Sequence, residues 1–197
     1  MPEKAKPQIT AIILAAGGST RFGASKQLHR YAGEPLVRRA VAAVLSAGIE
    51  EVIVVVGSGA DEVSRMLDDM PDVRMVANAQ WDTGIASSIK AGITATNQAE
   101  GVLITLADQP LIDSTALGHL IELFDETHRI IASKYADTIG VPAVFGVEHF
   151  EALKSLTGDH GAGLWIRQRI AEVTVVPLDA AAIDIDTPLD AARLEEP

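Results

Sequence analysis

The fold is decided by the stretch Ile9–Lys26, which reads ITAIILAAGGSTRFGASK. Its first part is a short apolar run, which is typical of a strand that helices cover on both faces. Its second part is rich in Gly and Ser, so the backbone can turn tightly there and approach a ligand. A buried strand followed at once by a Gly-rich loop favours an open α/β sheet, in which ligands bind beyond the carboxyl ends of the strands.

Short β-branched runs alternate with longer amphipathic stretches along the rest of the chain. This alternation predicts a single three-layer αβα, Rossmann-like domain of the α/β class with a mostly parallel sheet, over residues 1–197. The tails, at about residues 1–7 and 195–197, are expected to fray. The expected strands are Thr10–Leu14, Val52–Val56, Arg74–Ala77, Val102–Leu106, Ile130–Ser133, Ala143–Phe145 and Val173–Pro177. The expected helices are Leu36–Ala47, Ala60–Asp69, Ile85–Thr94, Ser114–His128, Val147–Lys154, Gly163–Ile170 and Leu189–Leu194.

Composition excludes several kinds of protein. The 197 residues include 27 acidic and 16 basic ones, a net charge of −11, whereas a protein that neutralises nucleic-acid phosphates carries the opposite sign. The absence of Cys excludes disulfides, Cys-ligated zinc and thiol catalysis. No apolar stretch approaches the roughly 20 residues that a membrane span needs. The run after Lys4 and Lys6 is better explained by a first strand than by a signal peptide, so we expect a cytoplasmic protein without nucleic-acid or membrane partners.

The Gly-rich loop has the parts of a polyphosphate-binding site. Consecutive amides at Gly17 and Gly18 can form a nest for an anion. Arg21 offers a planar fork for phosphate oxygens, and Lys26 offers a mobile point charge. The alternative is a Gly-rich turn with two solvated cations.

Two better-known glycine motifs fit poorly. A P-loop would need Lys where Ala24 stands, although Gly18 and Gly23 have its spacing. The dinucleotide-binding pattern is matched only in part at Gly57-Ser58-Gly59, which we interpret as an ordinary strand-to-helix turn.

Carboxylates follow two of the apolar segments. Asp108 comes directly after the expected strand that ends at Leu106, and Asp184 and Asp186 follow a segment near the end of the chain. Two carboxylates from separate strand ends can share one Mg²⁺ ion, which keeps some waters and bridges substrate phosphates. The alternative is that these carboxylates cap surface turns.

A set of spaced motifs carries a family resemblance. The pattern Leu14-Ala15-Ala16-Gly17-x-Ser19-x-Arg21-x-Gly23-x-x-Lys26 resembles the signature of nucleotidyltransferases that activate small phosphates with a nucleoside triphosphate. The other motifs are Trp81-x-x-Gly84-x-x-x-Ser88-x-x-x-Gly92, Asp108-Gln109-Pro110, Gly140-x-Pro142, Gly158-Asp159-x-Gly161 and Asp184-Ile185-Asp186-Thr187-Pro188. Nearly end to end, the chain most resembles the molybdenum cofactor cytidylyltransferases, which are MobA-like NTP transferases.

The resemblance implies an Mg²⁺-dependent enzyme that transfers CMP from CTP to the phosphate of a molybdopterin-type acceptor and releases pyrophosphate. It implies Arg21, Lys26 and Asp108 as catalytic residues and Asp108 and Asp186 as metal ligands. Asp184 would then support these ligands or replace one of them. The nucleotide-binding residues would be Leu14, Ala15, Ala16, Gly17, Gly18, Ser19, Arg21, Lys26, Ser88 and Gly92. The acceptor-binding residues would be Gln109, Pro142, Gly158, Asp159 and Asp184.

The resemblance leaves the substrates partly open. Ala16 favours CTP, because guanylyltransferase relatives more often have glycine there, and GTP is the alternative. Val141 and Gly163 stand where the family often has histidine and arginine, and both lie in the acceptor region. A sugar- or alcohol-phosphate acceptor is therefore a further alternative, and so is a non-catalytic nucleotide-binding module, although the presence of both Lys26 and Asp108 argues against the module. A molybdoenzyme or its chaperone would be the protein partner.

Overall fold

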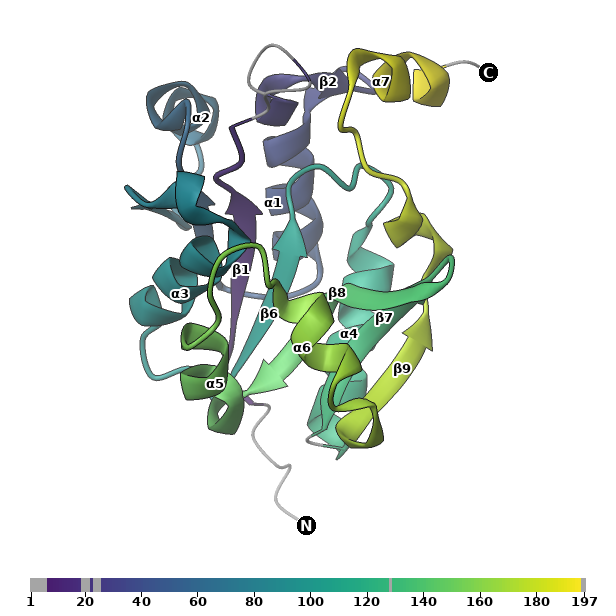
Figure 1. Ribbon diagram of the computed structural model, residues 1–197. Coiled ribbons are helices and arrows are strands. Elements are labelled where there is room, and N and C mark those ends of the chain that lie inside the picture. The colour runs from purple at the N-terminus through teal and green to yellow at the C-terminus, as the bar shows by residue number, and fades with distance from the viewer. Residues whose placement is uncertain (1–6, 19–21, 23–25, 128, 196–197) are drawn as a thin grey trace.

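The computed structural model describes residues 7–18, 22, 26–127 and 129–195. Within these residues a seven-stranded sheet has the order β5-β4-β1-β6-β8-β7-β9 (Figure 1). Its strands are β1 (Ile9–Ala15), β4 (Glu51–Val56), β5 (Val73–Ala77), β6 (Gly101–Leu106), β7 (Ile130–Tyr135), β8 (Thr138–Gly146) and β9 (Val173–Pro177). A separate two-stranded ribbon pairs β2 (Arg30–Tyr31) with β3 (Glu34–Pro35).

Helices cover both faces of the sheet. The α-helices are α1 (Leu36–Ser46), α2 (Ala60–Leu67), α3 (Ile85–Ala95), α4 (Ser114–Thr127), α5 (Phe150–Lys154), α6 (Ala162–Arg167) and α7 (Pro188–Glu195). Short 3-10 helices are η1 (Lys26–Leu28), η2 (Trp81–Thr83), η3 (Val147–His149), η4 (Ile170–Glu172) and η5 (Asp179–Ala182). No helix among the described residues is long and apolar enough to cross a membrane.

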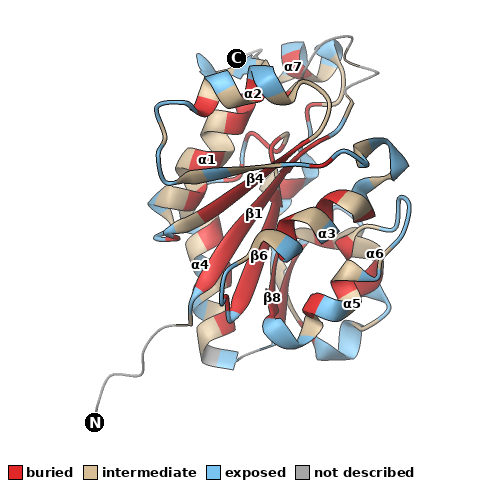
Figure 2. Cartoon of the chain, turned by 90° about the vertical axis from the view of Figure 1, so that its left-hand side faces the viewer, coloured by how far each residue is buried: buried red, intermediate tan, exposed pale blue. Residues whose placement is uncertain are grey.

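The alternation of side chains along each strand divides the core into two parts. Ala11 and Ile13 of β1 pack with α1, α2 and α4, whereas Ile12 and Leu14 pack with α3, α5 and α6. Successive side chains of a strand point to opposite faces, so an apolar run such as β1 serves both helical layers. Figure 2 shows the central strands buried between helices whose outer sides are exposed. The three-layer αβα domain is therefore as predicted.

The sheet is mostly parallel, as predicted, with one exception. β1 runs parallel to β4 and β6, whereas β8 runs antiparallel to β6 and β7. The register between β7 and β8 shifts so that Ala132 faces Ala143 but Ser133 faces Gly140. Val141 and Pro142 are therefore the extra residues of a β-bulge, a position where proline is tolerated because it donates no ladder hydrogen bond.

Several predicted bounds differ from the structure. The expected short strand Ala143–Phe145 is part of the longer β8, and the expected helix Val147–Lys154 divides into η3 and α5. The expected helix Gly163–Ile170 begins one residue earlier and ends at Arg167. Most of the two expected tails, residues 1–6 and 196–197, lies outside the described residues.

Candidate functional site

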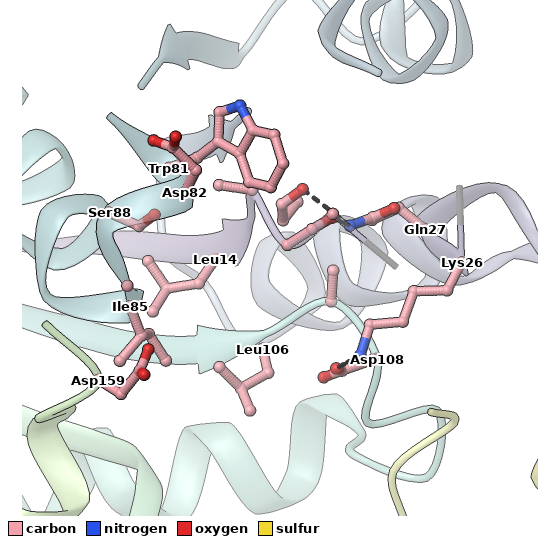
Figure 3. A pocket seen from close by; sticks show the side chains of 16 residues that line it. Leu14, Lys26, Gln27, Trp81, Asp82, Ile85, Ser88, Leu106, Asp108 and Asp159 are labelled. Atoms are coloured by element: carbon pink, nitrogen blue, oxygen red, sulfur yellow. Dashed lines mark hydrogen bonds and ion pairs between the residues drawn. The ribbon is translucent and has the colours of Figure 1, made fainter. Parts of the chain in front are cut away.

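A cleft of about 380 Å³ opens where β1 and β6 end (Figure 3). The carboxyl edge of a parallel sheet is where α/β proteins bind ligands. The cleft is lined by Leu14, Ala15, Ala16, Gly17, Gly18, Lys26, Gln27, Trp81, Asp82, Gly84, Ile85, Ser88, Leu106, Ala107, Asp108 and Asp159. Most of the residues that the sequence predicts to bind a nucleotide therefore lie together.

One end of the cleft holds a lysine between two carboxylates. Lys26 Nζ donates hydrogen bonds to Asp108 Oδ2 and to Asp186 Oδ1, the latter at 2.8 Å. The three residues come from η1, from the turn after β6 and from the segment before α7, and the side chain of Lys26 is only 14% exposed. Burial by itself would lower the pKa of Lys26, but the two carboxylates outweigh it and raise the pKa above its usual 10.5. Lys26 is therefore a permanent cation at neutral pH.

The backbone around Asp186 explains how a residue near the end of the chain reaches this cleft. The amide of Ile185 donates to the carbonyl of Asp108 (3.0 Å), and the Ile185 side chain is fully buried against Leu36 and Ala191. Thr187, the residue after Asp186, caps α7, because its Oγ1 accepts a hydrogen bond from the amide of Asp190 (3.2 Å). These contacts hold Asp186 beside Asp108.

The carboxylates fit a hard divalent cation. Asp108 Oδ1 is buried and has no hydrogen-bond partner among the described residues, so this oxygen is able to bind a cation. The pKa of Asp184 is raised because the carboxyl is partly screened from water and lies near Asp108 and Asp186. No group of three or more His, Cys, Asp or Glu among the described residues forms a complete metal site. Mg²⁺ suits such a partial set, because it usually keeps several waters and binds through one or two carboxylates plus substrate phosphates.

Gln27 holds the Gly-rich loop by hydrogen bonds to its backbone, a role that the sequence does not predict. Its Nε2 donates to the carbonyls of Ala15 and Gly17, each at 3.0 Å, and the side chain is only 2% exposed. An amide that bonds backbone carbonyls ten or more positions away leaves no periodic signal in the sequence. The predicted residues Ser19 and Arg21 lie outside the described residues.

Trp81 forms one wall of the cleft against two glycines. A Cβ at Gly18 would lie 2.6 Å from Trp81 Cζ3, and one at Gly57 would lie 2.5 Å from Trp81 Cβ. Both positions must therefore lack a side chain for the indole to lie there. The ring packs on the loop and also faces the cleft (Figure 3).

The start of α3, which follows Trp81 closely in the chain, also lines the cleft. Ser88 lines the cleft, and its Oγ accepts a hydrogen bond from the buried Asn78 Nδ2 (3.0 Å). The amide of Ala86 donates to the carbonyl of Gly158 (3.1 Å), which joins the loop before α6 to this helix. Gly92 instead faces the sheet, since a Cβ there would lie 2.4 Å from Ile12 Cγ2.

The residues predicted to bind the acceptor are spread over a wider area. Asp159 lines the cleft, and Gly158 precedes it. Gln109 is buried and donates to the carbonyl of Ala181 (2.8 Å), while Pro142 lies in the bulge of β8. Asp184 is close enough to Asp108 and Asp186 to raise its pKa, as described above.

A fold of this kind is found in a solved nucleotidyl transferase. The nucleotidyl transferase from Methanothermobacter thermautotroptrophicus superposes with a TM-score of 0.80 at 27% identity over 95% of each chain. The chain matches the MobA-like NTP transferase domain over residues 11–173. It belongs to the MobA-like NTP transferase family.

Two further relatives extend the comparison. The crystal structure of Rv0371c from Mycobacterium tuberculosis superposes with a TM-score of 0.82 at 29% identity, over 96% of this chain and all of that one. A second structure of that protein is a complex with manganese, with a TM-score of 0.75 at 28% identity over 95% of this chain and 97% of that one. The nicotine blue oxidoreductase of Paenarthrobacter nicotinovorans is 31% identical over 192 residues, which cover 92% of this chain and 93% of that protein. Because that name denotes an oxidoreductase, likeness of sequence does not by itself fix the reaction.

Proposed function

We propose that the protein is an Mg²⁺-dependent nucleotidyltransferase that transfers CMP from CTP to a phosphate-bearing acceptor of the molybdopterin type and releases pyrophosphate. The observation that carries the proposal is the juxtaposition of Lys26, Asp108 and Asp186 beside the Gly-rich loop. This end of the cleft combines a fixed cation with two oxygen donors, and polyphosphate chemistry needs both.

The reaction requires little proton transfer by the protein. An ionised oxygen of the acceptor phosphate attacks the α-phosphorus of the nucleotide, the bond to the bridging oxygen of the β-phosphate breaks, and pyrophosphate leaves. Because the attacking oxygen is already an anion, catalysis consists of alignment and charge neutralisation. Lys26 holds the Asp108 and Asp186 carboxylates in the ligand-free protein and would contact phosphate oxygens in the complex.

Asp108 and Asp186 would be the protein's ligands to the metal ion. A bound Mg²⁺ ion would neutralise charge on the phosphates, which is the usual role of this ion with nucleotides. Asp108 Oδ1, which has no hydrogen-bond partner among the described residues, supports a cation at this end of the cleft, and the manganese complex of Rv0371c shows that a relative takes up a divalent cation.

The other end of the cleft suits the nucleoside. Trp81 offers an aromatic surface and Ser88 a hydroxyl, and Ala16 contributes a small apolar surface. Ala16 favours CTP over GTP, and the acceptor alternatives remain a sugar phosphate or an alcohol phosphate. A molybdoenzyme or its chaperone, in the cytoplasm, would receive the product of the proposed reaction.

Substitution at the charged end tests the proposal. We predict that Lys26→Ala and Asp108→Ala each lower turnover by roughly 10²–10³-fold, the usual cost of losing one preorganised electrostatic group. Pyrophosphate release would be measured with CTP, GTP, ATP and UTP against molybdopterin, sugar-phosphate and alcohol-phosphate acceptors. The exposed Lys90, on α3, provides the matched control Lys90→Ala, which should leave turnover unchanged.

Three outcomes would revise the proposal. Near-normal turnover in folded Asp108→Ala would show that Asp108 is not a ligand of a catalytic metal ion. Pyrophosphate release with a sugar phosphate and with no other acceptor would show that the acceptor is a sugar phosphate and not a molybdopterin. Tight CTP binding without turnover on any acceptor would favour a non-catalytic nucleotide-binding module.

A further inference from the structure

Asn78 directly follows β5 and is not among the described residues that line the cleft. The residue is nevertheless buried, at 7% exposed, and its backbone amide donates to the carbonyl of Val56 at the end of β4 (2.7 Å). A buried side-chain amide costs free energy unless it is hydrogen-bonded. The partners of this amide lie between Gln80 and Ser88, on the segment that leads into α3, so Asn78 acts on the cleft through that segment.

The hydrogen bonds of Asn78 fix which way its side-chain amide faces. Its Oδ1 accepts from the backbone amide of Gln80 (2.9 Å), a group that can only donate. Nδ2 therefore faces the other way, and it donates to Ser87 Oγ (2.8 Å) and to Ser88 Oγ (3.0 Å). A flipped amide would place its NH₂ group against the N–H of Gln80, so the network has one arrangement of donors and acceptors.

The two serines differ in what remains of their hydroxyl groups. Ser87 donates its hydrogen to the carbonyls of Gln80 (2.9 Å) and Gly84 (2.8 Å). The hydrogen of the Ser88 hydroxyl has no acceptor within the described part of the chain. Ser88 is only 4% exposed and lines the cleft, so a ligand that faces it with a donor would leave this buried hydrogen unpaired, whereas an acceptor would satisfy it.

A hydroxyl with a fixed polarity distinguishes only ligand groups that have one polarity themselves. A ribose hydroxyl both donates and accepts, so it would bind Ser88 in either orientation. The atoms at the edge of a nucleobase each have one polarity. In Figure 3, Ser88 and Trp81 lie away from Lys26 and Asp108, at the end of the cleft that suits the nucleoside. The base is therefore the part of a nucleotide that a fixed donor at Ser88 would recognise.

We propose that Asn78 is a positioning residue for base recognition, because it fixes Ser88 Oγ as a hydrogen-bond donor to an acceptor atom of the nucleobase. For cytosine the acceptor is O2 or N3. Asn78 itself makes no contact with the nucleotide. This inference rests on the proposed function, which takes the cleft as the nucleotide site.

A double-mutant cycle tests whether Asn78 acts through Ser88. Calorimetry would measure the dissociation constant of CTP with Mg²⁺ in the wild type, Ser88→Ala, Asn78→Asp and the double variant. Ser88→Ala should weaken CTP roughly threefold to tenfold, the usual cost of one neutral hydrogen bond. A carboxylate at position 78 would accept the Ser88 hydrogen and turn it away from the base. Asn78→Asp should therefore weaken CTP at least about fivefold more when Ser88 is present than in Ser88→Ala.

The cycle removes the effect of the added charge, because that charge acts on the triphosphate in both backgrounds. Equal fold losses of CTP in the two backgrounds would overturn the inference. If Asn78→Asp folds poorly, Asn78→Ala adds no charge and should still weaken CTP about twofold more with Ser88 than without it. Equal losses in that cycle would overturn the inference as well.

Two controls separate base recognition from a structural role. Tripolyphosphate has no base, so Asn78→Asp should change its binding by the same factor in both backgrounds. Asn97→Asp makes the same substitution at the other asparagine of the chain, which is exposed beyond the end of α3, and should leave CTP binding unchanged. A purely structural role of Asn78 would instead weaken CTP and tripolyphosphate alike, and that result would overturn the inference.

UTP identifies the atom of the base that Ser88 binds. O2 accepts in both cytosine and uracil, whereas N3 accepts in cytosine and donates in uracil. A loss in Asn78→Asp that is confined to CTP would assign the contact to N3, and an equal loss of CTP and UTP would assign it to O2. Either result supports the inference.

Wild-type binding separates this inference from the proposed function. Failure of the wild type to bind CTP would refute the proposed choice of nucleotide, and the cycle would then be measured with GTP, whose base also carries acceptor atoms. Binding of CTP without coupling between Asn78 and Ser88 would overturn the inference and leave the proposed function intact.

Discussion

Gly84, between η2 and α3, packs directly against the backbone of the loop that contains Gly158. Its φ of +112° lies in the region that favours glycine, and a Cβ there would lie 2.3 Å from the backbone carbonyl of Gly158. Gly48, after α1, also has a positive φ (+86°) but has open space around it. Gly84 also has a ψ of 169°, which places it in a region that almost no other residue adopts, so it differs from Gly48 both in packing and in backbone conformation.

We predict that Gly84→Ala destabilises the protein more than Gly48→Ala does. Positive φ alone costs a residue with a side chain roughly 1–2 kcal/mol, which is the expected loss at Gly48. Gly84→Ala should lose about 1–3 kcal/mol more, because a Cβ would clash with the Gly158 backbone and because alanine hardly adopts the backbone conformation of Gly84. Urea unfolding of both variants measures the difference, and equal losses would show that the Gly158 loop yields freely.

Lys26 gives a prediction about protonation. Its pKa is raised in the ligand-free protein because, although burial opposes the charge, Asp108 and Asp186 stabilise it. A raised pKa means that the ion pairs stabilise the fold fully below the usual value of 10.5, and that this stabilisation is lost as pH rises through the folded-state pKa.

NMR titration of the Lys26 side chain, with Asp186→Asn for comparison, checks this prediction. Removing one negative partner should lower the pKa relative to the wild type, since the opposing effect of burial remains. The same pKa in both proteins would show that Asp186 contributes nothing to the charge of Lys26.

At the scale of elements, local patterns predict some features well and others not at all. The apolar runs of β1, β4 and β6 identify these strands, and the expected helix Leu189–Leu194 is α7 with one more residue at each end. The expected strand Ala143–Phe145 is shorter than β8, because Gly140 and Pro142 interrupt the β pattern of the sequence. In the structure a bulge accommodates these residues within the strand.

The site itself depends on contacts that no local pattern encodes. The charged residues after β1 and β6 are predictable, because strand ends meet at one edge of a sheet. The contact of Lys26 with Asp186 spans 160 positions and depends on the burial of Ile185, which no periodicity reveals. The sequence resemblance, and not the spacing alone, brought Asp186 into the prediction.

The N-terminal cap of α7 lies next to the site in the chain and fixes the backbone that carries Asp186. Asp190 Oδ2 accepts hydrogen bonds from the amide and the hydroxyl of Thr187, both at 2.8 Å, and Thr187 Oγ1 accepts one from the amide of Asp190 (3.2 Å). These bonds lower the pKa of Asp190 below its usual 3.8. The capping box fixes the chain direction immediately after Asp186.

We predict that Asp190→Ala destabilises the protein at neutral pH and has less effect in acid. A lowered pKa means that the carboxylate stabilises the fold above its unfolded-state pKa, and that this contribution is lost as pH falls through the folded-state value. Urea midpoints at about pH 7 and about pH 3 would be compared with those of the control Asp137→Ala, at an exposed turn residue. An equal loss for Asp190→Ala at both pH values would contradict the predicted role of its charge.

At the scale of the whole molecule, the cleft gathers segments that are distant in the chain. The Gly-rich loop, the turn after β6 and the segment before α7 meet at the partly buried Lys26, in a chain whose net charge is −11. A ligand that contacts all these segments binds the folded chain and not the unfolded one. Its binding free energy therefore adds to the free energy of unfolding of the entire domain.

We predict that CTP with Mg²⁺ raises the melting temperature. At about 100 times the dissociation constant the added stability is about 2.7 kcal/mol, which corresponds to roughly 5–10 °C for a domain of this size. Differential scanning calorimetry would compare the wild type with Lys26→Ala and Lys90→Ala. The shift should persist in Lys90→Ala, shrink in Lys26→Ala because the phosphates lose their cation, and shrink in the wild type when a chelator removes the metal. An undiminished shift in Lys26→Ala would mean that the triphosphate binds elsewhere on the molecule, since no ligand held at the charged end of the cleft would be indifferent to that residue.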